Sequence, residues 1–265
     1  MNLGNAHQGL GKFAEAEREF RRALALRERA LGPDHAEVAV TLANLGSAVD
    51  DQGRQAEALE IEERGIAVAE KAFGPEHPSL VIQLLNNGLL LRKLGRDDDA
   101  MARYRRAQTI AVKAFGPEHV HVAYSWIAMG DLSLNRDRPR VALAQFQRAL
   151  PILEKTYGPT HPQVAQALLC IGKSLLDLRK PARALPVLER LDRFPTDSYK
   201  PDDIGLRRFY LARALWETKR DRPRARRLAL GAREELARAE AGTEGYLADV
   251  DRWLARHRER PARSR

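Results

Sequence analysis

The chain has 265 residues, 45 Lys and Arg against 36 Asp and Glu, a formal net charge of +9 and 44% hydrophobic residues. This composition excludes an intrinsically disordered chain, and the absence of any apolar run of about 18 residues excludes a membrane-spanning helix. The single cysteine, Cys170, excludes an internal disulfide and a cysteine-based zinc site. Because the N-terminal segment also lacks the basic and apolar stretches of a signal peptide, we expect a cytoplasmic protein.

Five short loops recur along the chain at a constant spacing of 42 residues. Four of them combine Gly-Pro, a third residue that is acidic or polar, and His, at positions 31–35, 73–77, 115–119 and 157–161. The fifth, at positions 199–203, keeps the aromatic residue and the proline but lacks the glycine and the histidine. Such regularity is typical of stacked units that each pack on their neighbours.

The segments between the loops predict pairs of helices. From the N-terminus, the apolar periodicity predicts helices over 1–10 and 13–30, 36–51 and 55–72, 78–94 and 97–114, 120–135 and 139–156, 162–178 and 181–193, and 202–218 and 222–240. A last helix, from Thr243 to about His257, has one apolar face and is expected to cover the final pair.

Columns of large and small residues, also spaced by 42, indicate how the helices of a pair meet. In the first helix of each pair a large residue precedes a small one by four positions: Leu42 and Gly46, Leu84 and Gly88, Trp126 and Gly130, Leu168 and Gly172, Tyr210 and Ala214. In the second helix an alanine precedes a residue that is large in most units: Ala16 and Phe20, Ala58 and Glu62, Ala100 and Tyr104, Ala142 and Phe146, Ala184 and Leu188. We expect the helices to approach closely at the small residues.

This pattern resembles the tetratricopeptide repeat (TPR), whose usual period is 34 residues. A period of 42, the Gly-Pro-Asp/Glu-His loops and segments such as Leu42-Ala-Asn-Leu-Gly46 resemble the kinesin-light-chain type, over residues 1 to about 200. The resemblance implies an all-α protein, a right-handed α-solenoid of helix-turn-helix repeats with a C-terminal capping helix. HEAT-like repeats are the alternative because their period is also about 40 to 47, but the two small columns favour TPR.

These features predict one TPR solenoid over residues 1–240, a capping helix over 241–258 and a basic, frayed tail over 259–265. The expected repeats are about 1–35, which is truncated, 36–77, 78–119, 120–161, 162–201 and 202–240, which is degenerate. Either the chain is a fragment of a longer protein or the first repeat is loose. The apolar face around Leu3 and Leu10 could then pair with a second copy in a homodimer or with missing upstream residues.

The resemblance also implies a concave groove lined by the first helix of each repeat. By position, the groove residues are Asn44, Ser47, Asn86, Lys93, Tyr124, Asp131, Asn135, Gln166, Lys173 and Arg208. An asparagine amide both donates and accepts, so Asn44 and Asn86, with Asn2, are suited to hold an extended peptide backbone. The alternative is that these asparagines bond to neighbouring helices and only set the packing of the repeats.

The sequence gives no sign of catalysis. His35, His77, His119 and His161 occupy equivalent loop positions, and stacked helices lie about 8 to 10 Å apart, too far for such residues to share one metal ion. We expect these histidines to pack or cap at helix starts. Cys170 has neither a histidine partner nor a helix N-terminus to activate it. We therefore expect a non-enzyme without a metal or cofactor.

The predicted function is non-catalytic capture of a peptide segment or a partner protein, and two alternatives stay open. The segments 209–225 and 250–256 resemble the TPR tails of some bacterial serine/threonine protein kinases, which implies a detached regulatory tail. Residues 201–265 carry +6 of the net charge, and an electrostatic nucleic-acid binder would use their arginines. These are Arg222, Arg224, Arg226, Arg227, Arg252, Arg256, Arg258 and Arg260. Since no aromatic platform accompanies them, we favour a protein partner.

Overall fold

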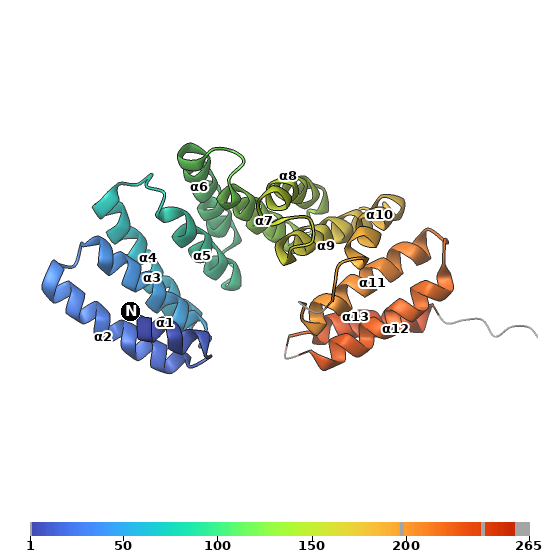
Figure 1. The fold of residues 1–265 in the computed structure, drawn as a ribbon, viewed down its shortest axis with the longest axis horizontal. Helices are drawn as coiled ribbons and strands as arrows, with labels where there is room; N and C mark the ends of the chain where they lie inside the picture. Colours follow the sequence, from blue (N-terminus) through green and yellow to red (C-terminus); the bar gives the residue numbers. More distant parts are fainter. Residues whose placement is uncertain (1, 197–198, 240–241, 258–265) are drawn as a thin grey trace, which may run out of the picture. The chain divides into compact units, whose positions relative to one another are not determined.

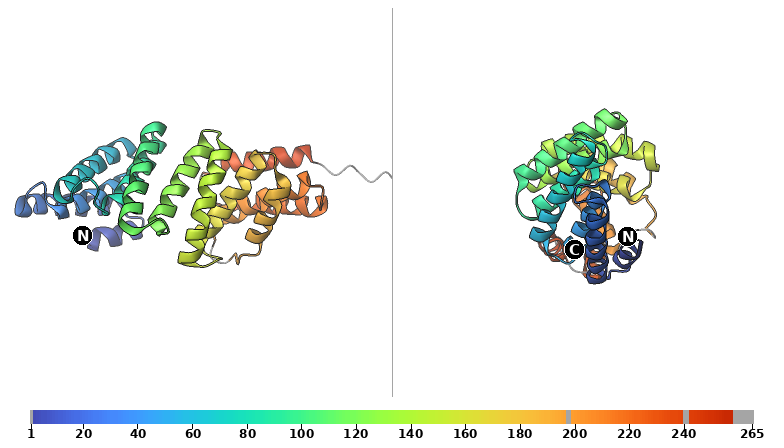
Figure 2. Two further views of the ribbon diagram at one scale, coloured as in Figure 1. Left: turned by 90° about the horizontal axis from the view of Figure 1, so that it is seen from above. Right: turned by 90° about the vertical axis from the view of Figure 1, so that its left-hand side faces the viewer.

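The computed structural model describes residues 2–196, 199–239 and 242–257. In these ranges all regular structure is helical, with thirteen α-helices and no strand (Figure 1). The chain divides into two compact units, residues 1–132 (unit 1) and 133–265 (unit 2). Within each unit, consecutive helices form hairpins that stack side by side (Figure 2). The all-α expectation is therefore confirmed.

The helices follow the predicted ranges closely. Unit 1 contains α1 (Asn2–Gly9), α2 (Phe13–Leu31), α3 (Ala36–Asp50), α4 (Gln55–Phe73), α5 (Leu80–Lys93), α6 (Asp97–Phe115) and most of α7 (Val120–Asn135). Unit 2 contains the end of α7, α8 (Pro139–Tyr157), α9 (Pro162–Asp177), α10 (Pro181–Asp192), α11 (Pro201–Glu217), α12 (Arg222–Arg238) and α13 (Glu244–Arg256). Every helix end lies within two residues of its prediction.

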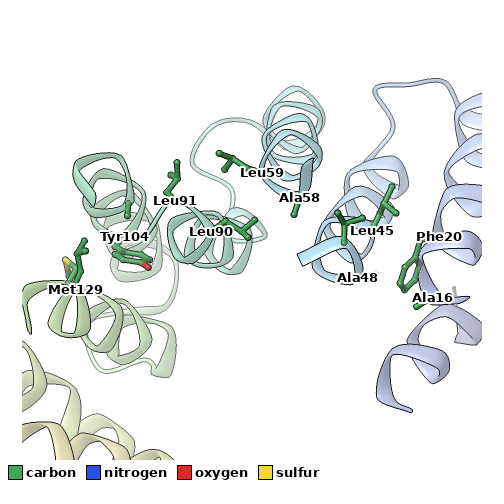
Figure 3. Close-up of a cluster of buried hydrophobic side chains, with 13 residues drawn as sticks. Ala16, Phe20, Leu45, Ala48, Ala58, Leu59, Leu90, Leu91, Tyr104 and Met129 are labelled. Carbon is green, nitrogen blue, oxygen red and sulfur yellow. The ribbon is translucent and has the colours of Figure 1, made fainter. Parts of the chain in front are cut away.

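Large side chains of the second helix pack on small residues of the first. A Cβ atom added to Gly88 would lie 2.4 Å from Cε1 of Tyr104, and one added to Gly172 would lie 2.4 Å from Cδ2 of Leu188. In the first repeat, a Cβ added to Gly4 of α1 would lie 2.6 Å from Cε1 of Phe20. Figure 3 shows that Phe20 of α2 also lies beside Ala48 and Leu45 of α3, the first helix of the next repeat. The small columns are therefore required by close helix approach.

The repeated loops start the following helices as the sequence indicates. Their glycines, Gly32, Gly74, Gly116 and Gly158, have φ between 87° and 93°, which side-chain-bearing residues rarely adopt. The Nδ1 atoms of His35, His77, His119 and His161 accept from backbone N–H groups two residues ahead, at 3.2 to 3.3 Å. Three of these rings also stack on the loop aromatic, at 4.4 to 4.6 Å between centroids. The structural role of the histidines is confirmed.

We expect His161→Ala to lower the free energy of unfolding by about 1 kcal/mol, because the variant loses a helix cap and a ring contact. His161 caps α9 through the Gln163 N–H and stacks on Tyr157 at 4.4 Å. His161→Asn, which keeps a capping side chain, should lose less. Urea unfolding followed by circular dichroism compares the two, and equal loss in both would contradict the capping role.

The fifth repeat departs from the others. Its second helix, α10, has 12 residues, whereas α2, α4, α6 and α8 each have 19. Pro195 accounts for the early end, because a proline disfavours helical conformation in the residue before it and removes a backbone donor. The helix ends at Asp192 with Arg193 as its C-cap, and the chain reaches α11 through an irregular segment, part of which is described.

The last helix, α13, packs on α12. Trp253 is mostly buried and meets the rings of Phe209 and Trp216 edge-on, at 6.3 and 5.5 Å between centroids. These contacts are those expected of a capping helix. The predicted basic tail, residues 259–265, lies outside the described residues, and the proposed division into repeats, cap and tail stays a prediction.

Candidate binding groove

A cavity of about 300 Å³ lies in unit 1 on the first helices of two successive repeats, α5 and α7. It is lined by Ile82, Leu85, Asn86, Leu89, Arg92, Tyr104, Tyr124, Ile127, Ala128 and Asp131. Three predicted groove residues, Asn86, Tyr124 and Asp131, are among them. Aliphatic and aromatic side chains make most of the wall, and an amide, a guanidinium and a carboxylate add polar groups. This composition is typical of pockets that hold an apolar side chain and orient it by a few polar contacts.

The side-chain amides of two predicted groove residues, Asn44 and Asn86, have no partner in the described part of the protein. Asn86 is exposed and Asn44 is half-buried, and among the described residues neither side chain makes a hydrogen bond. The neighbouring Asn87 is instead fully buried and faces Glu62 of α4. Asn87 thus contributes to contact between helices, whereas the amides of Asn44 and Asn86 remain available for a ligand.

Several other predicted groove residues are engaged within their unit. Gln8 Nε2 donates to Ser47 Oγ at 2.9 Å, and Lys93 pairs with Asp50 at 2.7 Å. Lys173 pairs with Asp177 at 2.7 Å, and Arg208 pairs with Glu235 of α12 at 2.9 Å. These contacts order the side chains before any ligand arrives.

The other two predicted groove residues, Asn135 and Gln166, take no part in these ion pairs and hydrogen bonds. Asn135 is exposed at the end of α7, and Gln166 lines a second cavity, which lies in unit 2. No observation tests the predicted residues as a binding site, so the groove stays a prediction.

The burial of the Glu62 carboxyl group was not predicted from the sequence. Glu62 is 7% exposed. It occupies the position at which the other repeats have a large residue: Phe20, Tyr104, Phe146 and Leu188. Burial, followed by the negative charge of Asp50, raises the pKa of Glu62 to about 8, while the Asn87 amide and Lys93 oppose the increase. The signal available in the sequence was a single carboxylate in an otherwise large and mostly apolar column.

The described residues offer no metal site. No three His, Cys, Asp or Glu side chains come close enough in this part of the chain to hold an ion. His119 and His121 lie 4.9 Å apart between ring centroids and pack with Phe115, and Cys170 is buried. No helix within the described ranges is both long and apolar enough to cross a bilayer.

Stacked helical hairpins with small residues at each crossing define an α-helical repeat protein. The chain belongs to the tetratricopeptide repeat family, whose model matches residues 1–71 and 80–155. It is an all-α TPR solenoid, and the HEAT-like alternative is set aside. No curated protein matches the chain.

Solved structures with the same fold include proteins of the kinesin-light-chain type. BtubC (BKLC) from P. vanneervenii has a TM-score of 0.69 at 16% identity, covering 96% of this chain and 94% of that one. A protein from Podosopora anserina, described as a kinesin light chain with nearly identical TPR-like repeats, has a TM-score of 0.62 at 19% identity, covering 72% and 90%. PilF of Pseudomonas aeruginosa has a TM-score of 0.67 at 18% identity, covering 96% and 95%.

The likeness to kinesin-light-chain repeats is therefore confirmed at the level of fold. TPR proteins are generally non-catalytic scaffolds that commonly bind protein partners. The resemblance to the tails of bacterial kinases stays a prediction.

Proposed function

We propose that this chain is a non-catalytic interaction scaffold that binds an extended peptide segment of a partner protein along α3, α5 and α7. The observation that carries the proposal is the pair of unengaged amides, Asn44 and Asn86, at equivalent positions of successive repeats. Asn86 also lines the mostly apolar cavity. A cytoplasmic location and a homodimer through Leu3 and Leu10, which are 58% and 70% exposed, remain further proposals.

The spacing of the repeats supports an extended ligand. Packed helices lie about 8 to 10 Å apart, and an extended peptide rises about 3.3 Å per residue. Asn44 and Asn86 would therefore meet backbone groups about three residues apart on one peptide. The cavity beside Asn86 would take an apolar side chain of that peptide against Ile82, Leu89 and Tyr124.

We expect the double variant Asn44→Ala, Asn86→Ala to bind peptide about tenfold or more weakly. Each backbone hydrogen bond contributes about 1 kcal/mol, about fivefold in Kd. The ligands would be peptides selected on phage by the purified chain, with affinities measured by fluorescence anisotropy. Asn5→Ala, an exposed amide on α1, is the matched control. Unchanged affinity in the double variant, with unchanged helical content, would overturn the role of the two amides.

The contacts made by the C-terminal arginines favour peptide binding over nucleic-acid binding. Arg224 pairs with Asp192 at 3.1 Å, Arg226 donates to the His257 carbonyl at 3.1 Å, and Arg252 pairs with Asp249. Arg222 lies over the Trp216 ring at 5.0 Å. These contacts direct four of the eight arginines to partners within unit 2. Arg258 and Arg260 lie outside the described residues.

A further inference from the structure

A second cavity, of about 280 Å³, lies wholly within unit 2 between α9 and α11, beside the end of α10. Leu169 and Leu191 supply apolar wall, and Gln166, Tyr199, Asp203 and Arg207 bring polar groups to it. The cavity is separate from the groove along α3, α5 and α7, and an inference about it does not depend on the function proposed above.

The cavity lies where the fifth repeat breaks the pattern. The second helices of the earlier repeats are about two turns longer than α10, which ends at Asp192. Beside the cavity, those two turns are missing. In three of the earlier loops an aromatic ring stacks on the histidine, but here Asp203 occupies the histidine position. The Tyr199 hydroxyl donates to the Thr160 carbonyl at 3.0 Å, and its ring centroid lies 5.8 Å from the Arg207 guanidinium.

Arg207 occupies a position that is small and apolar in every earlier repeat. The equivalent residues, Ala39, Val81, Ala123 and Ala165, are at most 6% exposed. Arg207 itself is 5% exposed, so its guanidinium is held inside the protein. Burial lowers the pKa of Arg207, yet an arginine keeps its charge in proteins. A cation in a core position is costly unless an anion or hydrogen bonds compensate it.

The compensation is incomplete. Arg207 Nη2 donates to the backbone carbonyls of Asp192 and Phe194, at 2.9 and 2.7 Å. Its Nη1 atom is buried and has no hydrogen-bond partner among the described residues. The Asp192 carboxylate is paired with Arg224 at 3.1 Å. Arg207, which lines the cavity, therefore retains a charge and one donor atom without a partner.

We propose that this cavity binds the carboxylate of an organic acid with an apolar body, with Arg207 Nη1 donating to the carboxylate. A guanidinium matches the planar geometry of a carboxylate, and Leu169 and Leu191 suit a hydrocarbon portion. Asp203 also lines the cavity, so a ligand with a single negative charge is better matched than a phosphate dianion. The carboxylate belongs either to a free small acid or to the C-terminus of a partner polypeptide.

The test is calorimetric titration of the full chain with sodium hexanoate and with two hexapeptides ending in leucine, one with a free C-terminus and one amidated. We expect a carboxylate probe to bind and Arg207→Met to weaken it at least about tenfold. Arg183→Met removes the charge of an exposed arginine on α10, outside the cavity, and should change affinity less than about twofold. Asp203→Asn should tighten binding, because it removes a repulsive charge.

The probes separate the two sources of the carboxylate. Tighter binding of the free peptide than of hexanoate, with no binding of the amide, identifies a polypeptide C-terminus, and the reverse order identifies a free acid. Arg207→Met restores the apolar column and should fold, and Arg207→Gln provides a second variant of different shape. No binding of any carboxylate probe, or equal binding by the folded Arg207 variants, would overturn the proposal. The Asn44 and Asn86 double variant should bind hexanoate normally, so the two proposals fail independently.

Discussion

Glu62→Gln is expected to raise the free energy of unfolding by roughly 4 kcal/mol at pH 8.5 and by only about 1 kcal/mol at pH 5. The reason is the burial of the Glu62 carboxyl against α3 and α5, close to Asp50, which raises its pKa to about 8. Glutamine has nearly the same shape and no charge, so it removes the cost of ionising the group inside the protein.

The sign of the pH dependence follows from the two pKa values of Glu62. The carboxyl ionises near pH 4.5 in the unfolded chain and near pH 8 in the folded protein. Between these values the folded state holds a proton that the unfolded state has lost, so rising pH favours unfolding. The stability contributed by protonated Glu62 is present below about pH 4.5 and is lost as the pH rises to about 8.

Urea unfolding of the intact chain at several pH values, followed by circular dichroism, measures this effect. Glu63→Gln is the matched control, because Glu63 is the next residue of α4 and is exposed, with its carboxylate 3.8 Å from Arg103. The control should keep the pH profile of the parent protein. If Glu62→Gln also keeps that profile, the carboxyl is not buried in the way described.

The repeat period made most of the fold predictable from the sequence. Small residues recur at equivalent positions, such as Gly46, Gly88 and Gly172, because the helices approach closely there. Since the pattern is repeated, one irregular repeat does not hide it. The loop histidines were predictable for the same reason, since four copies with no common centre indicate a local role. Helix ends followed from the glycines and prolines of the loops.

The side-chain partners within the candidate sites were harder to predict. Positional counting selected Arg208, but Arg208 pairs with Glu235 of α12, and the adjacent Arg207 lines the cavity. The cavity beside Arg207 depends on where α10 ends, and an average repeat does not predict this. Lys93 likewise pairs with Asp50 one repeat earlier, a contact that depends on side-chain conformations. The periodic pattern predicts which helix of each repeat faces a groove but does not predict which side chains on that face are already paired.

Gly88→Ala is expected to lower the free energy of unfolding by about 2 kcal/mol, although alanine is the better helix former by about 1 kcal/mol. The added Cβ would lie 2.4 and 2.7 Å from Cε1 and Cδ1 of Tyr104, well inside contact distance. Tyr104 is 1% exposed and belongs to the core cluster shown in Figure 3, so a shift of its ring would disturb the packing of that cluster. Separation of α5 from α6 would instead expose that cluster.

The clash and the helix preference can be separated by two further variants measured by urea unfolding. Gly245→Ala introduces the same methyl group into α13, where nothing lies within 4 Å, and should stabilise the protein or leave it unchanged. Combining Gly88→Ala with Tyr104→Leu should cost less than the two separate losses added together, because the shorter side chain makes room for the methyl group. Strict additivity, or a Gly88→Ala variant as stable as the parent, would show that helix approach at Gly88 does not require a residue without a side chain. The small column would then need another explanation in every repeat.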